Sequence, residues 1–148
     1  MKILYILLFI ILLTILLTIL ASYICFRVAF YVPKKKPKCT EEFDLPKGKI
    51  YEPYHEQMIA WTKETRTFPQ ERFTITSFDG LKLSGKYFEH TPDAPIELMF
   101  HGYRGNAERD LSGAVQRCFS LGRSVLIVDQ RTSGHSEGNV ISFGINES

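Results

Sequence analysis

The chain has 148 residues, 18 of them basic and 16 acidic, and a formal net charge of +2 at pH 7. Six of the basic residues and none of the acidic residues lie at positions 1–40, which leaves 12 basic against 16 acidic residues at positions 41–148. The positive balance thus belongs to one short flank, and no stretch alternates basic with aromatic residues as single-strand binders do, so we expect no nucleic-acid partner.

Residues 3–26 form an uncharged, almost entirely apolar run of 24 residues. A helix needs roughly 20 such residues to cross the hydrocarbon core, so the run predicts a single-pass transmembrane anchor and a lipid bilayer as partner. A cleaved signal peptide is the alternative, but its apolar region spans only about 7–15 residues and ends at a small-x-small site. Thr14, Thr18 and Ser22 share one helix face, which is either a helix-packing surface or a scatter of small residues.

A basic and proline-containing linker occupies residues 27–49. It holds Arg27 and the lysine cluster at 34–38, whereas only Lys2 and the amino terminus precede the apolar run. The positive-inside rule favours a cytoplasmic side for the domain after the linker but does not decide it. The remaining residues, 50–148, are expected to form the folded domain.

Residues 53–66 predict a short helix. Pro53 suits its first turn, and the chain breaks again at Pro69. Apolar and small residues recur at helical spacing, which predicts a face that packs on the core or, alternatively, lies on the membrane surface. That face comprises Tyr54, Met58, Trp61 and Thr65.

A β-hairpin is predicted over residues 72–90. Apolar and polar residues alternate on both sides of Asp79-Gly80, and period-two alternation around Asp-Gly is a strong hairpin signal. Residues 91–95 are predicted to form a turn.

A strand–helix–strand unit comes next. Residues 96–100 and 124–128 predict parallel strands buried on both faces. Asn106 should cap the intervening helix, Glu108 and Asp110 suit its first turn, and Gly122 suits its end. Its apolar face is predicted at Leu111, Ala114, Val115 and Cys118.

Two loops leave the carboxyl ends of these predicted strands, at residues 101–106 and 129–138. Ligands of open α/β sheets bind beyond these strand ends. We expect the two loops to lie side by side and to carry the chemistry.

The hairpin, the strand ending in His101-Gly102, the helix and the strand leading into Asp129-x-Arg131 resemble the N-terminal half of α/β-hydrolases. The resemblance covers about residues 73–148 and looks closest to bacterial membrane-anchored members related to serine aminopeptidases and lysophospholipase-like esterases. It implies an α/β fold, here a hairpin plus a βαβ unit behind one transmembrane helix. It also implies hydrolysis of an acyl ester or amide.

The resemblance implies site roles for the two loops. Tyr103 would donate its backbone N–H to an oxyanion hole, and Gly102 would let the backbone approach the substrate. Arg104 and Gly105 belong with His101 to the supporting loop. Asp129 and Arg131 are expected to brace this loop by hydrogen bonds. The family's usual glycine after the arginine is replaced by Thr132.

The second loop also contains a literal Gly-x-Ser-x-Gly sequence around Ser136. A nucleophile elbow places its serine on a sharp turn directly between a strand and a helix. Ser136 stands eight residues beyond Val128, and no helical period comes after it. We therefore do not expect Ser136 to be the nucleophile, either alone or in a triad of His101, Asp129 and Ser136.

The cysteines and the remaining histidines carry no clear chemistry. Cys25, Cys39 and Cys118 are widely separated and form no metal-binding pattern, so no metal or cofactor is expected. They are interpreted as buried or incidental thiols, with acylation of Cys25 as an alternative. His55 and His90 are expected to be surface or boundary residues.

The predicted elements account for about four strands, whereas the superfamily's sheet has about eight. We therefore expect the sequence to be an N-terminal fragment that lacks the triad and is inactive alone, with the flank of strand 124–128 exposed. The alternatives are an inactive membrane-tethered interaction module and a small hydrolase that uses Ser136.

Overall fold

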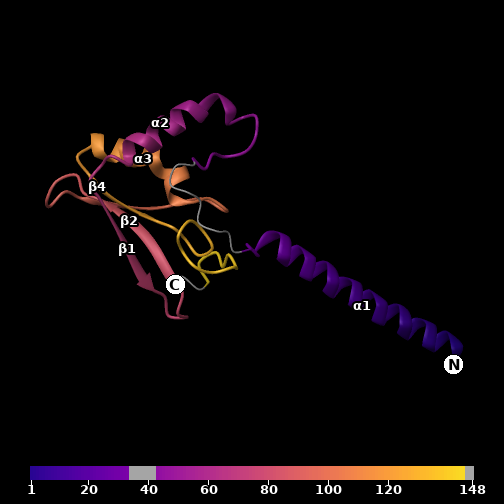
Figure 1. The fold of residues 1–148 in the computed structure, drawn as a ribbon. Coiled ribbons are helices and arrows are strands. Elements are labelled where there is room, and N and C mark those ends of the chain that lie inside the picture. The colour runs from indigo at the N-terminus through magenta and orange to yellow at the C-terminus, as the bar shows by residue number, and fades with distance from the viewer. Residues whose placement is uncertain (34–42, 146–148) are drawn as a thin grey trace.

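The computed structural model describes residues 1–33 and 43–145. A long N-terminal helix stands apart from a mixed α/β domain (Figure 1). The lysine cluster at 34–38 and Cys39 lie outside the described residues. In chain order the elements are α1 (Lys2–Ala29), η1 (Glu52–Tyr54), α2 (His55–Thr65), β1 (Gln70–Thr76), β2 (Lys82–Phe88), β3 (Ile96–Phe100), α3 (Ala107–Ser120) and β4 (Ser124–Val128).

Helix α1 is long and apolar enough to cross a membrane. It buries none of its residues against the rest of the chain. The hydroxyl groups of Thr14 and Thr18 donate to carbonyls one turn earlier, at 2.8 and 2.9 Å, so they are satisfied within their own helix.

The four strands form one sheet in the order β1-β2-β4-β3. Strands β1 and β2 are the predicted antiparallel hairpin, whose turn has Gly80 at a left-handed φ of 84°. Strand β4 pairs antiparallel with β2 and parallel with β3. The predicted hairpin, the strand boundaries at 96–100 and 124–128 and their parallel pairing are confirmed.

The expected burial of β3 is wrong. Ile96, Leu98 and Phe100 are 59%, 54% and 61% exposed, because β3 forms an edge of the described sheet and no described element covers that face. The exposed flank was predicted for β4, but β4 lies between β2 and β3 and buries Val125 and Ile127. The apolar pattern of a segment indicates that its side chains suit a buried strand. It does not indicate the position of that strand in the sheet, which depends on contacts between distant segments.

Helices α2 and α3 lie together over the sheet and cover its core (Figure 1). Thr65 of α2 is buried and donates its hydroxyl to the Ser112 carbonyl of α3 at 3.2 Å. Close approach of Trp61 to Gly113 adds to this contact, since a Cβ at Gly113 would lie 2.9 Å from the indole ring. Packing of this short helix on the domain is therefore confirmed at Trp61 and Thr65, whereas Tyr54 of the predicted face is exposed. The core comprises Phe88, Ala107, Val115, Cys118, Val125 and Ile127.

Both ends of α3 are capped as predicted. The Asn106 side chain accepts a hydrogen bond of 2.9 Å from the N–H of Arg109. At the other end Gly122 has a φ of 72° and donates its N–H to the Phe119 carbonyl, while Arg123 donates to Cys118. These two bonds form a Schellman motif, which satisfies carbonyls that the helix itself leaves open.

The segment immediately after α1 pairs with the last described part of the chain. Tyr31 forms an antiparallel bridge with Val140. The N–H of Val32 donates to Asn139 at 2.8 Å, and that of Ile141 donates to Phe30 at 2.9 Å. The first residues of the predicted linker are thus held against the domain.

Candidate active site

The loops at the carboxyl ends of β3 and β4 lie side by side, as predicted from their positions. The N–H of Gln130 donates to Nε2 of His101 at 3.0 Å, and the Gln130 side-chain amide donates to the His101 carbonyl. The Nδ1 of His101 lies 2.8 Å from the carbonyl oxygen of Gly102. Since Nε2 accepts, the imidazole proton resides on Nδ1 and is donated to that carbonyl. His101 is buried and joins the two loops.

Loop 101–106 makes a tight turn above β3. The N–H of Gly105 donates to the Gly102 carbonyl at 3.0 Å, and Arg104 has a left-handed φ of 55°. Gly105 is required sterically, because a Cβ there would lie 1.9 Å from the carboxylate of Asp110. The carboxylate thus fills the space that a larger residue would need.

Gly102 and Tyr103 stand at the outer surface of this turn. A Cβ at Gly102 would meet no atom within 4 Å, and its φ is not left-handed, so the fold itself does not require glycine there. Tyr103 is 54% exposed. Within residues 1–33 and 43–145, its backbone N–H makes no hydrogen bond. The turn therefore presents an unused donor beside open space.

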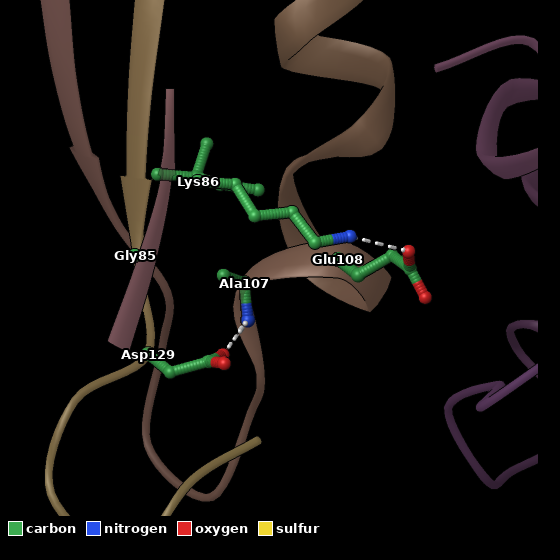
Figure 2. Close-up of a pocket in the computed structure, with 6 residues that line it drawn as sticks. Gly85, Lys86, Ala107, Glu108 and Asp129 are labelled. Carbon is green, nitrogen blue, oxygen red and sulfur yellow. Dashed lines mark hydrogen bonds and ion pairs between the residues drawn. The ribbon is translucent and has the colours of Figure 1, made fainter. Parts of the chain in front are cut away.

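Asp129 holds the second loop against the start of α3. Its Oδ1 accepts from the N–H of Ala107 and its Oδ2 from the N–H of His135, both at 3.0 Å. Figure 2 shows the first of these bonds below the helix. The N-terminus of a helix favours a carboxylate through its free N–H groups and its dipole. Asp129 contacts the first residue after loop 101–106.

The backbone conformation and the close approach of a carboxylate explain the glycine at position 134, the first of the Gly-x-Ser-x-Gly sequence. Gly134 has a φ of 49°, and a Cβ there would lie 2.1 Å from the Asp129 carboxylate. Ser136 accepts a 2.9 Å hydrogen bond from the N–H of Ser84 and donates to the carbonyl of Asp129. No helix comes after it within the described part of the chain, so it does not occupy a nucleophile elbow.

The alternative triad of His101, Asp129 and Ser136 is not assembled. Both imidazole nitrogens of His101 are engaged with the backbone of Gln130 and Gly102. The Ser136 hydroxyl donates to a carbonyl and not to an imidazole. A serine needs an adjacent base to become a nucleophile, and these contacts leave none for Ser136.

Arg131 pairs with a residue of the hairpin turn. Its guanidinium pairs with both oxygens of Asp79 at 2.6 and 2.9 Å, so it braces the turn between β1 and β2. The hydrogen bond from Arg131, and to a smaller extent that from Ser77, holds the pKa of Asp79 well below its usual range. Loop 101–106 is braced by His101, and Asp129 bonds Ala107, the residue that comes directly after the loop.

Thr132 occupies a backbone conformation that favours glycine. Its φ is 71°, and its N–H donates to the Glu137 carbonyl at 3.1 Å. A β-branched residue rarely adopts a positive φ, since its side chain crowds the adjacent carbonyl. The loop thus keeps the turn despite the substitution, at the cost of local strain.

The small cavity beside Asp129 is structural. Its volume is about 20 Å³, enough for roughly one water molecule. Glu108 at its edge bonds Lys86 at 3.0 Å and Arg66 at 2.7 Å; Figure 2 shows the contact with Lys86. Burial raises the pKa of Glu108, but the hydrogen bond from Arg66 and the charge of Lys86 lower it to about 2. Glu108 is therefore an ionised structural residue and not a proton donor at neutral pH.

Sequence reasoning missed a contact between loop 101–106 and the membrane-type helix. The Tyr103 hydroxyl donates to the Ala29 carbonyl, and the Arg104 guanidinium donates to the Val28 carbonyl. The Tyr103 ring also stacks on Phe143 at 5.6 Å between centroids. The sequence shows a tyrosine and an arginine in a predicted loop, but the residues around them do not indicate that their partners lie in α1.

The other histidines lie away from these loops. The Nε2 of His55 is 3.1 Å from the carbonyl of Pro46, and the ring of His90 packs edge-on against Phe119. Their predicted role as surface or boundary residues is consistent with these contacts. Within the described residues no group of three or more His, Cys, Asp or Glu side chains could hold a metal ion.

No protein-family profile matches the sequence. Its structural neighbours include α/β-hydrolases and esterases. The Pyrococcus furiosus esterase Pf2001 is 25% identical, with a TM-score of 0.49 over 57% of this chain and 34% of its own. An α/β-hydrolase from Vibrio vulnificus is 15% identical, with a TM-score of 0.42 over 75% of this chain and 42% of its own. An esterase from Pyrobaculum calidifontis is 18% identical, with a TM-score of 0.41 over 55% and 29%.

The chain thus spans about a third of the length of the esterase Pf2001. The bacterial membrane-anchored branch stays a prediction.

Proposed function

We propose that this chain supplies the membrane anchor and one half of the oxyanion hole of a serine hydrolase of the α/β-hydrolase superfamily. The reaction would be hydrolysis of an acyl ester or amide at or near a membrane. One observation carries the proposal: the N–H of Tyr103 is unpaired within the described residues and stands at the carboxyl end of β3. Ligands of α/β sheets bind at that end of the strands.

The chemistry requires such a donor. Attack on a carbonyl places negative charge on its oxygen, and a fixed N–H stabilises that charge by an amount worth about 10²–10³ in rate. The donor must be held in place before the reaction. His101 supplies this support, since its ring is buried and bonded to both loops.

In this proposal the nucleophile, the acid and the base come from outside positions 1–148. Ser136 is bonded to Ser84 and Asp129, and His101 is bonded to Gln130 and Gly102. The Ser136 hydroxyl and the His101 ring therefore have structural roles, and a catalytic role would require them to break these bonds. The chain alone is expected to be inactive.

Labelling with a fluorophosphonate probe tests the reaction. The protein would be captured from its source cells with an antibody against residues 50–145, labelled, and mapped by peptide mass spectrometry. We expect a labelled serine outside positions 1–148. Label on Ser136 would support a small self-contained hydrolase and contradict the proposal.

The anchor is a separate part of the proposal. We propose that α1 is retained and spans the bilayer, because its 28 residues exceed the length of a signal-peptide apolar region. The protein should then resist extraction by alkaline carbonate and keep residues 2–29 in its intact mass. Loss of these residues would identify a cleaved signal sequence instead.

An inactive membrane-tethered interaction module is the second candidate. The exposed apolar face of β3, formed by Ile96, Leu98 and Phe100, is the observation in its favour. Failure of the captured protein to react with the probe at any serine would favour this module over the hydrolase.

A further inference from the structure

The C-terminal end of α1 is bonded to the candidate oxyanion loop by side chains. The last carbonyls of any helix lack partners within the helix. Here the Tyr103 hydroxyl donates to the carbonyl of Ala29, and the Arg104 guanidinium donates to that of Val28 and, at 3.5 Å, to that of Tyr31. A cation near a helix C-terminus is also favoured by the helix dipole. Loop 101–106 is thus held directly against the end of the predicted span.

Aromatic and apolar side chains gather around this contact. Phe30 stacks on Phe26 at 5.6 Å between ring centroids and meets Phe143 edge-on at 5.7 Å. Phe143 in turn stacks on Tyr103. We call this surface the joint face; it comprises Phe26, Phe30, Tyr103, Arg104 and Phe143, together with Ile145, whose N–H donates to the carbonyl of Ser142 beside Phe143.

The joint face is exposed although much of it is apolar. Tyr103, Phe143 and Ile145 are 54%, 64% and 81% exposed. Phe143 also has a left-handed φ of 48°, so a bulky residue is presented to the outside on a strained backbone. Contact with water would not favour exposing these apolar side chains on a strained backbone, whereas contact with an apolar partner would.

We propose that the joint face lies in the headgroup layer of the bilayer that α1 spans, so that loop 101–106 opens at the membrane surface. Three features point to the bilayer as the occupant. The face is continuous with the end of the span, since Phe26 belongs to α1. Tyrosine is enriched at this depth of membrane proteins, as Tyr103 would be, and arginine can keep its charged head at the interface while its stem packs on apolar groups, as Arg104 would. The helix carbonyls, which meet few donors in lipid, are satisfied by residues of the face itself.

This inference rests on the proposed anchor and not on hydrolysis. It goes beyond anchoring, because a flexible tether would leave the orientation of the domain free. Here the N–H of Val32 donates to the carbonyl of Asn139, and the N–H of Ile141 donates to that of Phe30, so the chain that leaves α1 is held against the segment that leads to Phe143.

Brominated lipids test the orientation. The full chain would be reconstituted in palmitoyl-oleoyl phosphatidylcholine vesicles in which some lipids carry bromine near the ester end of one acyl chain. Tryptophan would be introduced by Phe143→Trp and, separately, by Ile145→Trp, with native Trp61 present in every protein. Bromine quenches tryptophan only at short range, so the added quenching reports the depth of each reporter.

Leu121→Trp is the matched control. Leu121 is 62% exposed, close to the 64% of Phe143, but it lies beyond the opposite end of the sheet, just before β4 begins. Phe143→Trp keeps an aromatic ring at the stack with Tyr103 and changes little else. Ile145→Trp provides a second reporter that is independent of that stack.

The expected result is at least twofold stronger quenching of the reporters at 143 and 145 than of the reporter at 121. Equal quenching at all three sites, in protein that resists carbonate extraction, would overturn the joint face and leave the anchor standing. If carbonate extracts the protein, both the anchor and the joint face fail. Cross-linking of two copies through residue 143, without quenching there, would assign the face to a second copy and also overturn the proposal.

Discussion

The Nε2 of His101 accepts a hydrogen bond of 3.0 Å from the backbone N–H of Gln130. This contact joins the loop after β3 to the loop after β4. It also determines the tautomer of His101, whose Nδ1 then donates to the Gly102 carbonyl. The histidine of the His-Gly pair is thus a structural support for the turn that carries Tyr103, and not a base.

Replacing this histidine should destabilise the domain. His101→Phe keeps a ring of similar size at this buried position but leaves the part-buried N–H of Gln130 and the Gly102 carbonyl without their partner. We expect a loss of about 1–3 kcal/mol, the usual cost of an unsatisfied buried group. Urea unfolding of the full chain in detergent, monitored by Trp61 fluorescence, measures it. His90→Phe, at an exposed histidine, is the control and should change stability by about 0.5 kcal/mol or less.

The Asp129 carboxylate needs both of its oxygens as acceptors. Asp129→Asn retains one acceptor, so either Ala107 or His135 loses its bond. The expected loss is about 1–2 kcal/mol. Gly134→Ala should cost at least as much, because its Cβ would collide with the same carboxylate. Asp93→Asn, at an exposed turn, provides the control; a similar loss there would contradict a specific role for Asp129.

Thr132 offers a stabilising substitution. Thr132→Gly removes a side chain from a backbone with a φ of 71°, and relief of this strain should raise stability by about 1 kcal/mol. The greater freedom of glycine in the unfolded chain offsets part of the gain. Thr132→Ala keeps the positive φ and should not be stabilising. Thermal unfolding of the unchanged protein and of the two variants separates relief of strain from the entropy of the unfolded chain. A glycine variant less stable than the unchanged protein would rule out strain at Thr132.

Glu108 should make stability depend on pH in acid. Its folded-state pKa is lowered to about 2 by its ion pairs with Arg66 and Lys86, which outweigh burial. A depressed pKa contributes stability above the unfolded-state value of about 4.3, and that contribution is lost as pH falls toward the folded-state value. Glu108→Gln should therefore flatten the stability profile between these two pKa values. Glu71→Gln, at an exposed residue of β1, should leave the profile unchanged.

Local patterns predicted most elements of the fold. Asp79-Gly80 marked the hairpin, Asn106 and Gly122 marked the ends of α3, and the apolar run marked α1. Each of these signals acts within a few residues of the feature that it produces, so a single sequence carries it.

The errors concern contacts between distant segments. The apolar pattern of β3 predicted burial on both faces, but its place in the sheet depends on how β4 pairs with β2. Arg131 pairs with Asp79, which lies 52 positions earlier in the chain, and the sequence around Arg131 did not indicate that contact. The contact of Tyr103 with Ala29 spans 74 positions and could not be inferred from either segment alone.

The candidate site shows the same division. The position of the His-Gly pair at a strand end was predictable from sequence, and so was the mismatch of Ser136 with a nucleophile elbow. The support that His101 gives to the second loop was not predictable, because a buried histidine can act as a base, bind a ligand or support a loop. Its role is determined by its hydrogen-bond partners, which the sequence does not show.

We expect the Tyr103 N–H to stabilise the oxyanion of a hydrolase. Replacing the amide before Tyr103 by an ester, through the corresponding α-hydroxy acid, removes this N–H and keeps the side chain. In the whole protein that reacts with fluorophosphonate, we expect the labelling rate to fall about 10²–10³-fold. The same replacement before Arg104 is the control. A rate that falls no further at 103 than at 104 would contradict the account.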